Sequence, residues 1–96
     1  MKFRQYSKYA QKTLQKKFSV VFLALGLSGE VGEVANLVKK QQRDQVDHNE
    51  RILEELGDAL WYLTVLCHEL GSSLEEVAVG NIEKLADRYE AGQSQN

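Results

Sequence analysis

In the stretch Gly26-Leu27-Ser28-Gly29-Glu30-Val31-Gly32-Glu33-Val34, two glutamates stand three residues apart in a largely apolar sequence. A second stretch, Glu54-Glu55-Leu56-Gly57-Asp58-Ala59-Leu60-Trp61-Tyr62, repeats this arrangement with Glu55 and Asp58. Residues three apart in an α-helix lie about 60° from each other, so each pair directs two carboxylates to the same side. The spacing therefore predicts two helices, each carrying a pair of oxygen ligands.

Both acid pairs fall on the apolar faces of their helices. With Glu30 set at 0° and a rotation of about 100° per residue, the apolar residues of its helix fill an arc from roughly −20° to 140°. They are Leu37, Leu23, Val34, Leu27, Val38, Val31, Ala24 and Ala35. Glu55 lies within a similar arc, and Glu33 and Asp58 lie at the edges, at about −60°. Because a buried carboxylate is costly unless it is paired, protonated or bound to a cation, the two helices are expected to pack together around a divalent metal.

The four acids Glu30, Glu33, Glu55 and Asp58 form a candidate metal site. A set made only of carboxylate oxygens suits Mg²⁺, with Mn²⁺ as a substitute, far better than Zn²⁺ or copper. The sequence contains no Glu-x-x-His, which counts against a ferritin-like di-iron oxidase. Bound Mg²⁺ in turn usually implies a substrate that carries phosphate.

Strong 3.6-residue periodicity without proline predicts an all-α chain of four helices, with the two acid helices packed as an antiparallel pair. The first helix is expected to start at Phe3 and to end before Ser19. The others are expected at about 20–42, up to about 70, and about 74–89. The expected boundary signals are a cap at Ser19, capping boxes at Asp47 with Glu50 and at Ser73 with Glu76, and a stop at Gly71.

Three glycines in the second helix, Gly26, Gly29 and Gly32, each cost about 1 kcal/mol relative to alanine. Spacing alone is weak support for a phosphate-binding loop, because no strand precedes the glycines and no Gly-Lys-Ser/Thr follows them. We therefore expect them to allow close approach of another helix, or of a ligand beside Glu33.

Length and composition predict a single domain, residues 1–96, with a frayed tail from about residue 90. A net charge of −2 gives no reason to expect a nucleic-acid polymer or a membrane as partner. The longest apolar run, from Phe18 to Leu27, is too short to span a bilayer, and the single Cys67 cannot form an internal disulfide. A cytoplasmic protein is therefore expected. Because so small a core gives modest stability, we expect a homodimer or homotetramer to cover the remaining apolar surface.

The sequence resembles the MazG-like nucleotide pyrophosphohydrolases of the all-α NTP pyrophosphatase superfamily. The signature of that family is Glu-x-x-Glu, a spacer, and Glu-x-x-Asp, which the two acid pairs reproduce. The runs Gly-Leu-Ser-Gly-Glu-Val-Gly-Glu and Gly-Asp-Ala-Leu-Trp-Tyr also look like the family, as does a third block from Asn81 to Tyr89. Together these blocks cover roughly residues 20 to 90.

The resemblance implies a bundle-like all-α fold completed by oligomerisation. It also implies Mg²⁺-dependent hydrolysis of a nucleoside or deoxynucleoside triphosphate between the α and β phosphates, giving monophosphate and pyrophosphate, with house-cleaning of the nucleotide pool as the expected role. In this interpretation the four acids hold the metal, Glu33 is the general base, and Lys84 with Arg88 stabilises the developing charge.

The remaining candidate site residues have two interpretations each. Asn81, Lys84 and Arg88 on the fourth helix could bind substrate phosphates, as could Lys40, or the cations could simply favour helix ends. Trp61 and Tyr62 could stack on the base, although aromatic residues in a core helix are more often packing.

Two other functions stay open from the sequence. Phosphoribosyl-ATP pyrophosphohydrolase is similar in fold and acid pattern, and only the sequences Gly-Glu-Val-Gly-Glu and Leu-Trp-Tyr favour the MazG-like branch. A non-enzymatic helical interaction protein is the other alternative. The sequence suggests no nucleophile for covalent catalysis.

Overall fold

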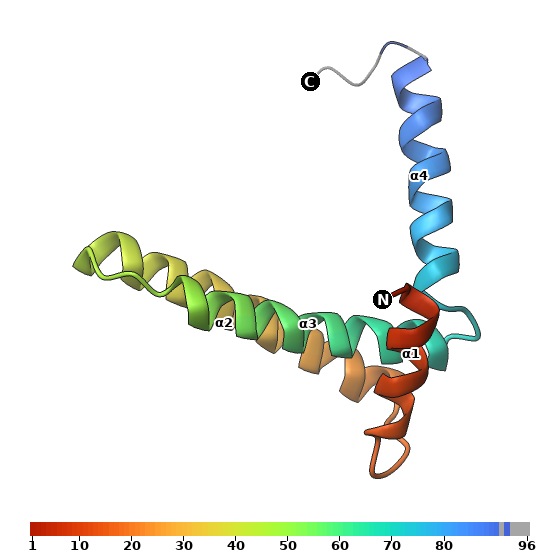
Figure 1. Ribbon diagram of the computed structural model, residues 1–96, viewed down its shortest axis with the longest axis horizontal. Helices are drawn as coiled ribbons and strands as arrows, with labels where there is room; N and C mark the ends of the chain where they lie inside the picture. Colours follow the sequence, from red (N-terminus) through yellow and green to blue (C-terminus); the bar gives the residue numbers. More distant parts are fainter. Residues whose placement is uncertain (91, 93–96) are drawn as a thin grey trace.

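The computed structural model describes residues 1–90 and 92 and confirms an all-α fold (Figure 1). Its helices are α1 (Phe3–Lys12), α2 (Val20–Asp44), α3 (Asn49–Glu69) and α4 (Leu74–Glu90). The ends of α2, α3 and α4 lie close to the expected positions. The expected frayed tail, from about residue 90, lies outside the described residues apart from Glu90, the last residue of α4, and Gly92.

Most of the expected helix boundary signals are confirmed. Ser19 caps α2, because its Oγ accepts a hydrogen bond from the backbone N–H of Phe22 at 3.1 Å. Gly71 ends α3 with a positive φ of 81°, a conformation that glycine adopts at little cost. At the start of α4, the Oγ of Ser73 accepts from the backbone N–H of Glu76 at 3.1 Å, which is the first half of the expected capping box. The Glu76 carboxylate accepts from the Ser73 hydroxyl at 3.4 Å, and a bond from the Ser73 backbone N–H to Glu76 is absent among the described residues.

The expected capping box of Asp47 and Glu50 is wrong. The residue that precedes the first turn of α3 is His48, and its side chain makes no capping hydrogen bond. Glu50 therefore stands one position too early to close a box. Asp47 instead accepts a hydrogen bond from the backbone N–H of Asn49 at 2.8 Å.

The first helix is shorter than expected, since α1 ends at Lys12 and an irregular segment follows up to Ser19. The hydroxyl of Thr13 donates to the carbonyl of Ala10 at 2.7 Å and accepts from Nε1 of Trp61 at 2.8 Å. A threonine side chain that bonds to the backbone competes with continuation of the helix. These bonds end α1 and fasten it to α3.

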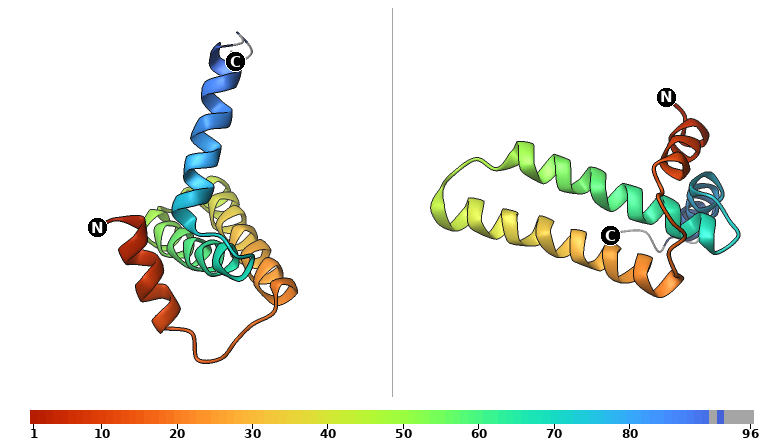
Figure 2. Two further views of the ribbon diagram at one scale, coloured as in Figure 1. Left: turned by 90° about the vertical axis from the view of Figure 1, so that its right-hand side faces the viewer. Right: turned by 90° about the horizontal axis from the view of Figure 1, so that it is seen from below.

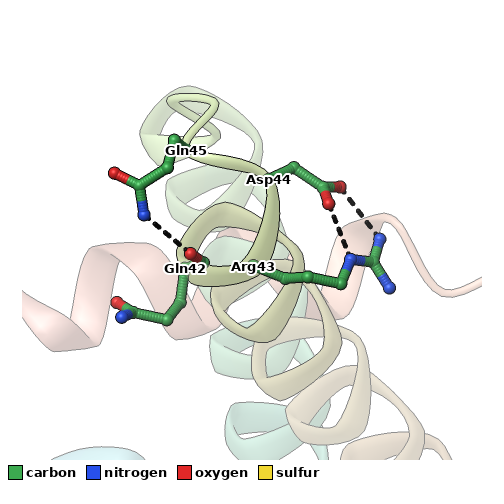
Figure 3. Close-up of polar contacts among 4 residues, drawn as sticks. All are labelled: Gln42, Arg43, Asp44 and Gln45. Atoms are coloured by element: carbon green, nitrogen blue, oxygen red, sulfur yellow. Dashed lines mark hydrogen bonds and ion pairs between the residues drawn. The ribbon is translucent and has the colours of Figure 1, made fainter.

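α2 continues to Asp44, slightly beyond its expected end. Figure 3 shows the guanidinium of Arg43 donating two hydrogen bonds to the Asp44 carboxylate, at 2.7 and 2.9 Å. Gln45 then adopts a left-handed backbone with φ of 56°, and its side-chain nitrogen donates to the carbonyl of Gln42 at 2.8 Å. The turn satisfies a carbonyl that the ending helix leaves free.

α2 and α3 lie side by side as an antiparallel pair, as expected for the acid helices (Figures 1 and 2). α1 packs across one end of α3, where Ala10, Leu23 and Val65 form a buried core. Partly buried side chains surround this core: Tyr6, Leu14, Phe18, Trp61, Tyr62 and Leu66. The best-packed part of the molecule is therefore the end of the pair that α1 covers.

α4 projects from this end instead of lying along the pair (Figures 1 and 2). It contacts α1 and α3, and among the described residues it makes no contact with α2. The expected bundle-like closure is therefore not formed within one chain, because the turn at Gly71 directs α4 away from the pair. Its apolar stripe is exposed along most of its length and includes Val77, Ile82, Leu85 and Tyr89.

One face of the antiparallel pair is also apolar and uncovered. Val31 and Val38 of α2 are 54% and 48% exposed, and Leu53 and Leu56 of α3 are 67% and 47% exposed. Helical rotation places all four on the flank opposite the one that carries Asp58. The apolar arcs of the acid helices are therefore wider than the faces that the two helices bury against each other.

By length and composition alone, α2 could cross a membrane. Packed helices of soluble proteins meet the same criterion, so this property is weak support for a membrane span. The packing of α2 on α3, with Glu30 directed to acids of α3, accounts for part of its apolar surface.

Candidate metal site and active site

Three of the four predicted acids meet between α2 and α3. Glu30, Glu55 and Asp58 each offer a carboxylate oxygen, and these oxygens all lie within 4.8 Å of one another. Glu30 and Glu55 are half-buried, whereas Asp58 is exposed. The three residues form an acid cluster that opens to solvent on the side of Asp58.

The fourth acid, Glu33, lies outside this cluster and is exposed. It lies three residues after Glu30, on the same flank as Asp58. The structure thus places Glu33 at the rim of the cluster, with its side chain exposed to solvent.

Close packing beside the cluster depends on one of the three glycines. A Cβ atom on Gly26 would collide with the ring of Tyr62, which stands four residues after Asp58 on α3. The expected close approach is therefore confirmed at Gly26. In the described chain, nothing lies within 4 Å of a Cβ built on Gly29 or Gly32. At these two positions, the expected close approach of another helix is therefore wrong.

The electrostatics of the cluster centre on Glu30. The pKa of its carboxyl is raised above the ordinary value of 4.5, first by hydrogen bonding with the Glu55 carboxyl, then by burial and by the nearby acidic charges. When both carboxyls are ionised, neither can donate, and Oε2 of Glu30 is buried with no hydrogen-bond partner among the described residues. Without a proton or a cation, this oxygen is an uncompensated buried acceptor.

A divalent cation fits this site on chemical grounds. The donors are carboxylate oxygens that converge from two helices, and the buried Oε2 of Glu30 has no other partner in the described structure. Hard cations such as Mg²⁺ and Mn²⁺ favour such oxygen ligands. Glu30, Glu55 and Asp58 are therefore the residues that would hold the ion.

The predicted cationic residues are not brought to the acids within one chain. Asn81, Lys84 and Arg88 are exposed on α4, which among the described residues has no contact with α2. Lys40 is half-buried on α2, but it stands ten residues after Glu30, about 15 Å along the helix axis.

The two aromatic residues after Asp58 are tied into the core. Trp61 and Tyr62 pack edge to face with ring centroids 5.2 Å apart, and both are half-buried against the core of α1, α2 and α3. Nε1 of Trp61 is already bonded to Thr13. These contacts favour the packing interpretation for both rings.

Tyr6 of α1 is a residue near the site that the sequence interpretation did not select. It is half-buried, and its pKa is raised by burial and by the negative charge of Asp58. Tyr6 belongs to the apolar face of α1, with Phe3, Ala10 and Leu14, and it carries the polar tip of that face. A hydroxyl on an otherwise apolar helix face was the sequence signal that could have identified Tyr6 as a residue near the site.

Comparison with known protein families matches residues 18–92 to the MazG nucleotide pyrophosphohydrolase domain. The chain belongs to the MazG nucleotide pyrophosphohydrolase family. The matched region contains all of α2 and α3, and hence the complete acid cluster.

Two curated proteins are similar to this MazG-family chain. One is the Gene 37 protein of Mycobacterium phage L5, 37% identical over 76 residues, which cover 74% of this chain and 67% of that protein. The other is the uncharacterized protein YvdC of Bacillus subtilis (strain 168), 34% identical over 80 residues, with 72% of this chain and 76% of YvdC covered. No solved structure matches the chain.

The raised pKa of Glu30 predicts a pH-dependent stability for the metal-free protein. The folded protein holds this proton more tightly than the unfolded chain does, so the stabilisation is fully present below the ordinary pKa of 4.5. It is lost as the pH rises through the raised pKa. Melting temperatures measured in EDTA should fall over this range in the wild type, and the fall should be smaller in Glu30→Gln. Equal slopes for the two proteins would contradict the assignment.

A bound divalent cation should counteract the loss of stability that the metal-free protein shows as the pH rises. Millimolar Mg²⁺ or Mn²⁺ should raise the melting temperature at neutral pH, because the ion binds only the folded protein and relieves the repulsion among the acids. The increase should shrink as the pH falls, because protons then compete with the ion for the carboxylates. A melting curve unchanged by either ion at neutral pH would count strongly against the site.

Proposed function

We propose that this protein hydrolyses a nucleoside or deoxynucleoside triphosphate between the α and β phosphates, releasing nucleoside monophosphate and pyrophosphate. The observation that carries the proposal is the convergence of Glu30, Glu55 and Asp58, which come from the two acid motifs of a MazG domain. A role in house-cleaning of the cytoplasmic nucleotide pool follows from this chemistry as part of the same proposal.

In the proposed mechanism, Glu30, Glu55 and Asp58 hold the Mg²⁺ ion. When bound, such an ion neutralises phosphate charge and lowers the pKa of a water ligand. Glu33, exposed at the rim, accepts the proton from the attacking water on a carboxylate oxygen. Lys84 and Arg88 bind the phosphate oxygens and stabilise the charge that develops on them.

The position of these two cations leads to a proposal about assembly. We propose a homo-oligomer, at least a dimer, in which the uncovered face of the α2–α3 pair and the apolar stripe of α4 are buried between copies. Because the uncovered face lies on the flank opposite Asp58, the copy that brings Lys84 and Arg88 to the acid cluster would pack its α4 on the Asp58 side of the pair. Mixing Lys84→Ala with Glu55→Gln protein should then restore part of the activity that each lacks alone. Sedimentation as a monomer, with no restored activity, would contradict this assembly.

The products of the reaction test the proposed function. Chromatography after incubation with triphosphates and Mg²⁺ should show nucleoside monophosphate and pyrophosphate in equal amounts. A panel of standard, deoxy and damaged nucleotides, together with phosphoribosyl-ATP, would identify the preferred substrate in the same assay. Diphosphate and orthophosphate as products would contradict the proposal even if the rate were high. No turnover of any substrate would favour a non-enzymatic protein.

A further inference from the structure

The helix α1 brings Tyr6 close to the acid cluster, although α1 lies outside the region that matches the MazG domain. That match begins at residue 18, whereas α1 spans Phe3–Lys12. The proposed mechanism gives Tyr6 no role. The position of its phenol follows from the way α1 crosses α3.

α1 packs on the same stripe of α3 that carries Asp58. At about 100° of rotation per residue, Trp61 and Val65 both lie within about 60° of Asp58 on α3. Val65 shares a buried core with Ala10 of α1, and Nε1 of Trp61 donates to the Thr13 hydroxyl at 2.8 Å. The stripe that α1 covers therefore continues to Asp58.

Tyr6 lies on the side of α1 that faces this continuation. Figure 1 shows α1 running across α3, so rotation about the axis of α1 corresponds to position along α3. Tyr6 and Thr13 lie within about 20° of each other on α1, and Thr13 is bonded to Trp61. Leu14, about 80° from Tyr6, instead lines a cleft with the last residues of α3. The phenol of Tyr6 is therefore directed toward the Asp58 end of the stripe.

The Tyr6 hydroxyl and the Asp58 carboxylate are a donor and an acceptor without other partners. Tyr6 is half-buried against the core, and among the described residues its hydroxyl makes no hydrogen bond. Burial and then the negative charge of Asp58 raise the pKa of Tyr6, so the phenol keeps its proton at neutral pH. In the same part of the chain, Asp58 has no hydrogen bond or ion pair.

We propose that Tyr6 is a positioning residue, whose hydroxyl donates a hydrogen bond to the Asp58 carboxylate and orients it toward the cation that the cluster would hold. Such outer partners fix the orientation of carboxylates that bind metals. Glu30 and Glu55 are half-buried, whereas Asp58 is exposed and has the most freedom to lose. The proposal rests on the metal site of the proposed function, and it gives α1 a part in that site.

Binding of Mn²⁺ to the full chain without nucleotide, measured from the electron paramagnetic resonance of the free ion, tests the proposal. Tyr6→Phe keeps the ring and its packing but removes the hydroxyl. It should weaken Mn²⁺ binding by roughly tenfold, the lower end for such partners, because water competes for the exposed Asp58. Tyr9→Phe removes the same hydroxyl from a position on α1 that is 67% exposed, and should change the affinity by less than about twofold. Equal Mn²⁺ affinities of the two variants would overturn the proposal.

A double-mutant cycle separates the hydrogen bond from an indirect effect on the fold. Asp58→Ala removes the acceptor at an exposed position, so adding Tyr6→Phe to it should weaken Mn²⁺ binding by less than about twofold further. The full tenfold loss in that background would overturn the proposal. A Tyr6→Phe variant that raises KM for the nucleotide at unchanged Mn²⁺ affinity would also overturn it, because the hydroxyl would then contact the substrate.

The wild type in the same experiment distinguishes this proposal from the proposed function. Wild-type protein that binds Mn²⁺ with an affinity unaffected by Tyr6→Phe would overturn the role of Tyr6 and leave the metal site standing. Wild-type protein that binds no Mn²⁺ would overturn both.

Discussion

Glu55→Gln is expected to lower the rate of nucleotide hydrolysis by roughly a hundredfold or more. Its carboxylate lies in the acid cluster with Glu30 and Asp58, and glutamine keeps the shape of the side chain while it removes a charged ligand oxygen. The metal-free variant should stay folded and should be no less stable than the wild type, because one repelling charge is gone. Steady-state kinetics at saturating Mg²⁺, with thermal melts on the same samples, measure both effects.

The adjacent residue Glu54 supplies the matched control. It is exposed and lies about 100° around the helix from Glu55, one turn before Asp58 on the solvent-facing flank, and its carboxylate is not part of the acid cluster. Glu54→Gln should therefore change the rate by less than about threefold, as expected for a substitution on a solvated face. An inactive Glu54→Gln beside an active Glu55→Gln would show that the register of α3, and the site built on it, is wrong.

Gly26→Ala is expected to destabilise the protein by about 1–3 kcal/mol. The added methyl group would collide with the ring of Tyr62, and that ring is held in the core between α1, α2 and α3. Moving the ring away from the added methyl group would disturb its packing on the core and its edge-to-face contact with Trp61. Unfolding in urea, with the change in midpoint at constant slope, measures this effect.

Gly29→Ala is the control for that substitution. In the described chain nothing lies within 4 Å of the added carbon, and alanine is the better helix former by about 1 kcal/mol. The two substitutions are therefore expected to have opposite signs. If Gly26→Ala stabilised the protein as well, the close contact between α2 and Tyr62 would be contradicted.

Local sequence signals predicted the helices and several of their ends well. The Ser19 cap and the Gly71 stop depend on a few neighbouring residues, so the sequence contains most of the relevant information. The end of α1 was not predictable in this way, because the hydrogen bond from Trp61 to Thr13 joins residues far apart in the chain. Asp47 was a plausible cap whose position proved to be one residue too early.

The candidate site was predictable only as far as helical rotation determines it. Rotation places Glu30 and Glu55 on facing surfaces, and the structure brings them together with Asp58. The orientation of α4 depends on a turn and on surfaces that one chain leaves uncovered, so rotation could not show that Lys84 stays apart from the acids. The proximity of Tyr6 to Asp58 likewise depends on how α1 crosses α3, which periodicity does not determine.

The most direct test of the central claim is a crystal structure of the protein with Mn²⁺, using the anomalous scattering of manganese. We predict an anomalous peak bounded by the carboxylates of Glu30, Glu55 and Asp58, with oxygen ligands at about 2.2 Å, as expected for a hard divalent cation. The number of peaks would also give the number of metal ions. Manganese bound only elsewhere, or no peak at this cluster at a concentration that supports turnover, would contradict the account.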